Sequence, residues 1–147
     1  MAGFAAAGTV RPGIALDQRI GPTHIGEPRA QITKDAGPGT AVLLDGKRLW
    51  FYSKAAIYVS FAPGPHTRAN QVALWILTQS SRYRTRSGVG VGSSLRRLRR
   101  GVTVRCYSAN PIVCQHERAN TNLPFTLFDV DPKTKWVTSV AIVPGGD

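Results

Sequence analysis

Two stretches of this sequence begin with an aliphatic residue and a glycine and continue with a short helical pattern: Ile25-Gly26-Glu27-Pro28-Arg29-Ala30-Gln31-Ile32 and Val91-Gly92-Ser93-Ser94-Leu95-Arg96-Arg97-Leu98. Their glycines lie 66 residues apart. Self-similarity at a fixed period indicates a repeated structural unit. We therefore expect two tandem repeats, at about 15–80 and 81–147, within a single domain that spans 15–147.

Each stretch carries signals for the start of a helix. In the second stretch Ser93 is suited to be the N-cap, because its hydroxyl can accept from the free amides of the first turn. In the first stretch Pro28 falls at the first helical position, where its missing N–H costs nothing. The charge of Glu27 suits the positive end of the same helix.

After each predicted helix the pattern becomes rich in β-formers. We expect strands at 41–44, 48–53, 56–61 and 72–78 in the first half, and at 103–107, 124–129 and 136–143 in the second. Asp45-Gly46 predicts a tight hairpin turn, since both residues tolerate a positive φ. The sequence therefore predicts an α+β fold, in which two tandem helix-plus-antiparallel-strand repeats form one sheet with the helices packed on one face.

Composition and the N-terminus limit the class of protein. With 147 residues, 42% hydrophobic and 18% charged, the chain is typical of a globular domain. Residues 1–14 are small and rich in glycine and alanine, which predicts a flexible arm. We expect no membrane span, because the apolar runs are shorter than the ~18 residues that one needs. The N-terminus does not have the form of a secretory signal, which leaves a cytoplasmic protein or one whose signal peptide was replaced by Met1.

The charge is unusually positive and unevenly distributed. The net charge is +11, and no acidic residue occurs between Asp45 and Glu117. We expect one patch from seven arginines in this stretch: Arg82, Arg84, Arg86, Arg96, Arg97, Arg99 and Arg100. Because arginine makes bidentate contacts with phosphates and carboxylates, the patch suits a polyanion or an acidic protein. The alternative is an ordinary solvated helix face.

Aromatic residues on the predicted strands are candidates for a protein contact surface. Trp and Tyr are enriched among the residues that dominate binding energy at interfaces. The candidates are Trp50, Tyr52, Tyr58 and Trp136. We expect Trp75, within an apolar run, to be part of the core.

The two cysteines, Cys106 and Cys114, flank a short loop and have no other partners in the chain. A disulfide between them fits an oxidised, exported protein. Two buried free thiols in a cytosolic protein are the alternative. A metal site with His116 lacks a convincing fourth ligand and the usual paired spacing, so we expect no metal.

The sequence offers little support for catalysis. The catalytic and nucleotide-binding motifs G-x-S-x-G, H-E-x-x-H and the P-loop are absent. His116 and Glu117 are adjacent, but adjacency in sequence does not create an active-site geometry. The Gly88 to Gly92 run lacks the spacing of a phosphate loop. We therefore expect no cofactor and no enzymatic activity, with a small hydrolase as the third alternative.

The first stretch, continued as Thr33-Lys34-Asp35-Ala36-Gly37, resembles the helix-opening segment of β-lactamase inhibitor proteins and of small outer-membrane lipoproteins of the barrel-assembly machinery. Those segments run aliphatic or aromatic, Gly, small or Met, Thr, Arg, two polar residues and Val, and close with Ala-Gly or Leu-Gly. This chain departs from them. The position of the Thr is occupied by Pro28 in the first stretch and by Ser94 in the second, and the position of the Arg is occupied by Leu95 in the second stretch. The inhibitor proteins are also similar in tandem layout, length and disulfides near strand ends.

The resemblance implies a concave sheet faced by helices, an exported location and protein binding without catalysis. Together with the residue patterns, it favours a monomeric module of the cell envelope or the extracellular space. Such a module would bind another, possibly acidic, protein through a concave sheet face with aromatics and the arginine patch. The rival hypothesis is a basic protein that binds a polyanion, either nucleic acid or an anionic envelope polymer.

Overall fold

The computed structural model describes residues 13–62, 71–118 and 123–145. Within these ranges the chain forms β1 (Ile14–Ala15), β2 (Arg19–Ile20), β3 (Thr23–His24), α2 (Arg29–Ala36), β4 (Thr40–Leu44), β5 (Lys47–Tyr52), β6 (Ile57–Phe61), β7 (Ala73–Thr78), α3 (Leu95–Gly101), β8 (Val104–Tyr107), β9 (Ile112–His116), β10 (Phe125–Val130) and β11 (Val137–Val143). No helix of this described part is long and apolar enough to cross a membrane.

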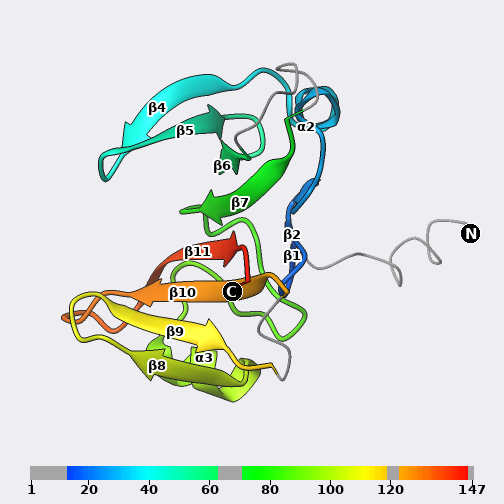
Figure 1. Cartoon of the computed structure of the whole chain (residues 1–147). Helices are drawn as coiled ribbons and strands as arrows, with labels where there is room; N and C mark the ends of the chain where they lie inside the picture. Colours follow the sequence, from blue (N-terminus) through cyan, green and yellow to red (C-terminus); the bar gives the residue numbers. More distant parts are fainter. Residues whose placement is uncertain (1–12, 63–70, 119–122, 146–147) are drawn as a thin grey trace, which may run out of the picture.

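Eight of the strands form one antiparallel sheet. Their order is β4-β5-β6-β7-β11-β10-β9-β8, so each half of the chain supplies four neighbouring strands. The halves meet where β7 pairs with β11. Figure 1 shows these strands stacked from β4 at one edge to β8 at the other. The short strands β1, β2 and β3 form a second, three-stranded sheet.

The same backbone hydrogen bonds hold the start of each helix against a central strand. For α2 and β7 they are Gly26 N to Ala73 O (2.8 Å), Ala73 N to Glu27 O (2.9 Å) and Arg29 N to Gln71 O (2.7 Å). For α3 and β11 they are Gly92 N to Val137 O (2.8 Å), Val137 N to Ser93 O (2.8 Å) and Leu95 N to Lys135 O (2.7 Å). The φ angles of Gly26 and Gly92 are 84° and 94°, a region that glycine adopts without strain. The aliphatic-glycine motif therefore encodes a turn that joins a helix start to the sheet.

The predicted fold class, α+β with helices packed on one face of the sheet, is wrong. The structure is 46% strand and 12% helix. Its two described helices have eight and seven residues, too short to form a layer. The helix α2 stops at Gly37, whose φ is 78°, and α3 gives way to the β-branched Val102 and Thr103.

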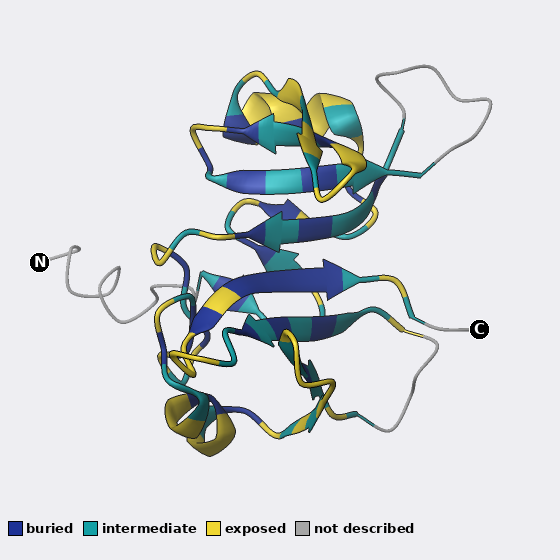
Figure 2. Ribbon diagram, turned by 90° about the vertical axis from the view of Figure 1, so that its left-hand side faces the viewer, coloured by how far each residue is buried: buried dark blue, intermediate teal, exposed yellow. Residues whose placement is uncertain are grey.

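The core on one face of the sheet, which we call the inner face, is completed by β1, β2, β3 and the segment 79–94, together with Ile32 and Ala36 of α2 and Leu98 of α3. Ile14, Ile20, Tyr83 and Val89 join the core cluster of the sheet, and the Tyr83 hydroxyl donates to Ala55 O. Figure 2 shows buried positions concentrated in the central strands, with exposed positions on α2 and α3. Of the predicted arm at 1–14, residues 1–12 lie outside the described part, and Ile14 is buried in β1.

The cap of α3 differs from the prediction by one residue. Ser94, rather than Ser93, is the N-cap, and its Oγ accepts from Arg97 N at 3.0 Å. Ser93 Oγ instead accepts from Gly90 N at 3.0 Å. Pro28, expected at the first helical position, is the N-cap of α2. Both helices therefore begin at sequence-equivalent positions.

Candidate functional site

The two faces of the eight-stranded sheet differ in what covers them. Successive residues of a strand point to opposite faces. One row across the sheet contains Phe51, Tyr58, Leu77, Ala141 and Leu127, which are opposite one another in the strand register. We call the face that carries this row the open face. Figure 1 shows α3 behind β8 and β9, on the side away from the viewer.

The open face is apolar and aromatic. Trp75 and Phe125 lie two residues from members of the row and therefore share its face. The side chains of Phe51, Tyr58, Trp75 and Phe125 are half-buried and do not belong to the core cluster. The rings of Phe51 and Tyr58 lie 4.7 Å apart between centroids. The result is a partly exposed aromatic surface over the middle of the sheet.

Two charged residues of the open face, Lys47 and Asp129, lie in defined surroundings. Lys47 Nζ lies 5.6 Å from the centroid of the Trp75 ring, a cation–π arrangement. Asp129, two residues after Leu127 on β10, shares this face. Burial raises the pKa of the Asp129 carboxyl above its usual value, and a hydrogen bond from Ser139 partly opposes the shift. The middle of the open face is therefore apolar, with one cation beside its tryptophan and one partly desolvated acid. The exposed Arg105 continues the row at the β8 edge, opposite Gln115.

The structure divides the predicted aromatic site. Of the four candidates, Tyr58 alone lies on the open face. Tyr52 is 1% exposed in the core, and Trp50 lies on the inner face with the Arg29 guanidinium 3.8 Å from its ring centroid. Trp136 is 58% exposed beside α3. Trp75, expected in the core, is on the open face instead.

Three of the seven predicted arginines are held by hydrogen bonds to other parts of the chain. Arg97 donates to Ser87 O, Arg84 donates to Ser93 Oγ at 3.0 Å, and Arg82 donates to Lys54 O at 3.0 Å. Arg86 is exposed on the segment before α3. Arg82, Arg84 and Arg86 lie on the segment that precedes α3, and Arg97 belongs to α3 itself. The other three, Arg96, Arg99 and Arg100, lie together.

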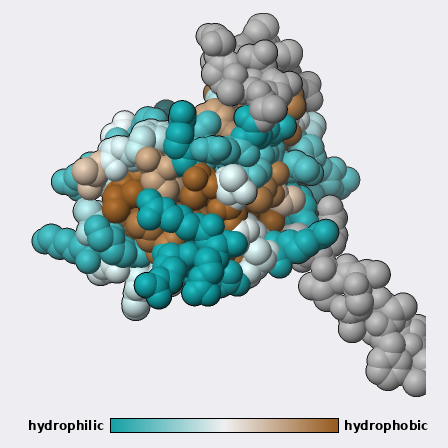
Figure 3. Space-filling view, turned by 90° about the horizontal axis from the view of Figure 1, so that it is seen from below, coloured by the Kyte–Doolittle hydropathy of each residue, from teal (hydrophilic) through white to brown (hydrophobic). Residues whose placement is uncertain are grey.

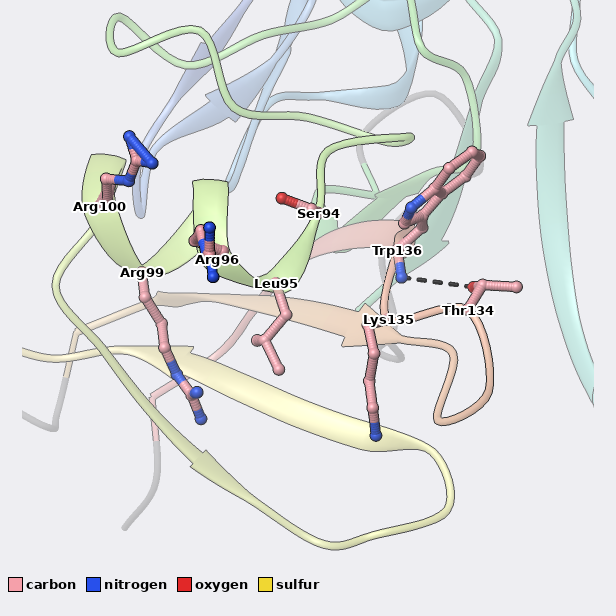
Figure 4. A pocket seen from close by; sticks show the side chains of 8 residues that line it. All are labelled: Ser94, Leu95, Arg96, Arg99, Arg100, Thr134, Lys135 and Trp136. Atoms are coloured by element: carbon pink, nitrogen blue, oxygen red, sulfur yellow. Dashed lines mark hydrogen bonds between the residues drawn. The ribbon is translucent and has the colours of Figure 1, made fainter.

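Arg96, Arg99 and Arg100 border a groove of about 540 Å³ between α3 and the turn that precedes β11. We call it the α3 groove, and its lining residues are Ser94, Leu95, Arg96, Arg99, Arg100, Thr134, Lys135 and Trp136. Figure 4 shows Leu95, Arg99 and Lys135 pointing to the same side, with Trp136 at one end. Figure 3, which views the molecule from the α3 end, shows apolar surface framed by hydrophilic side chains. The groove therefore combines an apolar floor with four cations.

The turn at residues 131–135 positions the far wall of the α3 groove. The carboxylate of Asp131 accepts from Lys133 N at 2.7 Å and from Thr134 N at 3.1 Å. These backbone hydrogen bonds lower the pKa of Asp131, so it is ionised at neutral pH. The bond from Leu95 N to Lys135 O, at 2.7 Å, fixes this turn to the first residue of α3.

A third cluster, around Asp17, was not foreseen from the sequence. Asp17 Oδ1 accepts from Thr126 N (2.8 Å) and Thr126 Oγ1 (2.9 Å). Its Oδ2 lies 2.7 Å from His116 Nδ1 and 3.2 Å from an Arg118 nitrogen. The four donors occupy the carboxylate, which is 8% exposed. These contacts hold the loop between β1 and β2 against β9 and β10. His116 and Asp17 therefore have a structural role in this cluster, whereas a hydrolase would need a histidine and an acid for catalysis.

The predicted disulfide is confirmed. Cys106 and Cys114 are bonded and lie opposite each other on β8 and β9. Their position is a cross-strand pair at the edge hairpin of the sheet. The sequence prediction placed a loop at 107–113, whereas the chain forms the strand β9 from Ile112 onward.

No family model, curated protein or solved structure matches this chain. The open face and the α3 groove are the candidate binding surfaces of the described residues.

Proposed function

We propose that this protein is an exported, non-catalytic module that binds another protein on the open face of its sheet. The observation that carries the proposal is the set of half-buried aromatic side chains, including Phe51, Tyr58 and Trp75, that lies outside the core cluster. Aromatic side chains at the centre of an interface supply most of the binding energy when a partner excludes water from them.

The charge of the protein supports an acidic partner. A net charge of +11 raises the association rate of a negatively charged protein over that of a neutral one. Lys47 beside Trp75 places a cation at the open face itself. The partner would therefore present an apolar patch bordered by carboxylates.

The exported location rests on the disulfide. Disulfides form and persist mainly in oxidising compartments, and Cys106 and Cys114 are bonded. The resemblance of 25–37 to inhibitor proteins and envelope lipoproteins points to the same location. The partner is then to be sought among envelope or extracellular proteins.

The test begins with a photo-crosslinking amino acid in place of Tyr58, on the open face. The matched control carries the same amino acid in place of Lys34, which is exposed on α2. A protein crosslinked only from position 58 is identified, produced and titrated against the purified full chain.

Two tryptophan variants then test whether the partner binds at the open face. Trp75→Ala is expected to weaken binding at least about tenfold, the effect of losing an interface hot spot. Trp136→Ala, outside the open face, is expected to leave the affinity unchanged. Raising the salt concentration should weaken binding only modestly. Equal affinity of Trp75→Ala and wild type, or crosslinks from position 34 alone, would overturn the proposal.

A further inference from the structure

The α3 groove has a chemistry distinct from that of the open face. Four cations, from Arg96, Arg99, Arg100 and Lys135, surround a floor formed in part by Leu95. The ion pairs of the described residues involve Asp17 and Glu27, and none includes these four cations. Asp131, in the turn that carries Lys135, interacts electrostatically with that lysine, whereas Arg96, Arg99 and Arg100 have no ion pair among the described residues.

The spacing of the arginines concentrates that charge on one side of α3. Residues three and four apart are neighbours on a helix surface, so Arg96 lies next to both Arg99 and Arg100. Like charges at this spacing repel each other and destabilise a helix slightly. An anion bound between them removes the repulsion and makes charge-assisted hydrogen bonds with each guanidinium.

Trp136 adds a planar apolar surface to the same groove. It is the most exposed aromatic side chain of the described residues, at 58%. Its backbone N–H donates to Thr134 Oγ1 at 3.3 Å, which holds the turn that carries the ring. Figure 4 shows the indole at the β11 end of the groove, directed to the opposite side from the Lys135 side chain and to the same side as Arg100. A planar ligand group would stack on this ring.

We propose that the α3 groove binds single-stranded nucleic acid. Its phosphates contact Arg96, Arg99, Arg100 and Lys135, and one base stacks on Trp136. Cations along a groove beside an exposed aromatic ring are what such binding requires. Apart from the four cations, which are assigned to phosphates, the polar lining groups are Ser94 and Thr134, and Ser94 Oγ already accepts from Arg97 N. Binding is therefore tolerant of sequence.

Other polyanions would contact the cations of the α3 groove but would leave the Trp136 ring without a stacking partner. An acidic peptide offers carboxylates to the cations but brings no regular series of planar rings to Trp136. A nucleic-acid duplex offers phosphates, but its bases are stacked on each other and unavailable to the indole. The combination of phosphate and free base favours the single strand.

The test measures fluorescence anisotropy of a labelled oligodeoxythymidylate of about 16 nucleotides, the upper site size of a compact single-strand binder. The full-length protein is titrated at low and at higher salt. With four phosphate contacts, the slope of log affinity against log salt is about −2.8, which is a loss of about 50-fold between 50 and 200 mM salt. Trp136→Ala is expected to weaken binding at least about fivefold, and Trp136→Phe to retain most of the affinity.

The arginine variant has a matched control. Arg96→Gln with Arg99→Gln removes two phosphate contacts and should halve the salt slope, to about −1.4. Lys34→Gln with Arg48→Gln removes the same charge from α2 and β5, at the opposite end of the sheet (Figure 1). This control should leave the slope unchanged, and circular dichroism verifies that both variants are folded.

Several results would overturn the proposal. One is an absence of binding at 50 mM salt, which is about one third of the physiological ionic strength. Another is an affinity for a duplex of the same length, or for polyglutamate, equal to that for the single-stranded oligonucleotide. Equal losses from the groove variant and its control would show attraction to the overall charge instead of to the groove. Trp75→Ala, on the open face, should bind the oligonucleotide as the wild type does, so the two binding proposals stand or fall separately.

Discussion

Replacing Asp17 tests what joins the N-terminal three-stranded sheet to the main sheet. The carboxylate of Asp17 accepts both the backbone N–H and the hydroxyl of Thr126, and Thr126 is fully buried. In Asp17→Ala these two donors have no acceptor. Each unsatisfied buried donor costs about 1–3 kcal/mol. A further cost of about 1 kcal/mol arises because Asp17 has a φ of 65°, a conformation that alanine adopts with strain.

These contributions sum to about 3 kcal/mol or more of lost unfolding free energy for Asp17→Ala. The contacts of Asp17 with His116 and Arg118 are lost as well and are not included in this sum. Asp17→Asn is the matched control. Asparagine keeps one acceptor oxygen for Thr126 and tolerates a positive φ, so its loss should be at most about half that of alanine.

Urea denaturation of both variants, followed by circular dichroism and tryptophan fluorescence, measures these losses. A double-mutant cycle with Thr126→Val should give a coupling energy of at least about 0.5 kcal/mol, because the two side chains are in direct contact. The reasoning is refuted if Asp17→Ala loses less than about 1 kcal/mol, or if asparagine is as damaging as alanine.

Three further predictions concern the disulfide, one carboxyl group and the two turn glycines. Reduction of the Cys106–Cys114 bond, with a sequence separation of 8, should lower the unfolding free energy by about 2.5 kcal/mol; urea melts with and without reductant measure this, and thiols that alkylate without reduction would contradict it. Burial raises the pKa of Asp129 in the folded state, so the native carboxyl binds its proton more tightly than the unfolded one. The contribution of this group to stability therefore falls as pH rises through its unfolded pKa and up to its folded pKa. Asp129→Asn should therefore be more stable than wild type at pH 7 and show a weaker decline over that range in thermal melts; an unchanged pH profile would disprove this. Gly26→Ala and Gly92→Ala should each cost about 1–2 kcal/mol, because a Cβ meets no atom within 4 Å at either position and the strain is that of the positive φ alone; unequal losses would contradict the matched turn geometry.

Most strands of the main sheet were predictable from the sequence. The predicted ranges 41–44, 48–53, 56–61 and 72–78 correspond to β4, β5, β6 and β7, and Asp45-Gly46 forms the hairpin turn between the first two. The strand β9 was missed because Asn110 and Pro111 suggested a loop. The strands β1, β2 and β3 have two residues each, too few for a periodic pattern to form.

The functional surfaces were harder to predict. Trp50, Phe51 and Tyr52 are consecutive and all aromatic, so polarity does not alternate and cannot indicate which ring points outward. Some of the predicted arginines are held by backbone oxygens far away in the sequence, as Arg82 is by Lys54 O. The sequence does not reveal these contacts. Asp17 and His116 are 99 positions apart, and only the fold brings them together.

Hydroxyl-radical footprinting of the full-length protein, alone and saturated with the protein crosslinked from position 58, tests protein docking on the sheet. Oxidation of Phe51, Tyr58 and Trp75 is expected to fall in the complex, while Trp136 is labelled to the same extent as in the free protein. Undiminished labelling of Trp75 together with protection of Trp136 would contradict it.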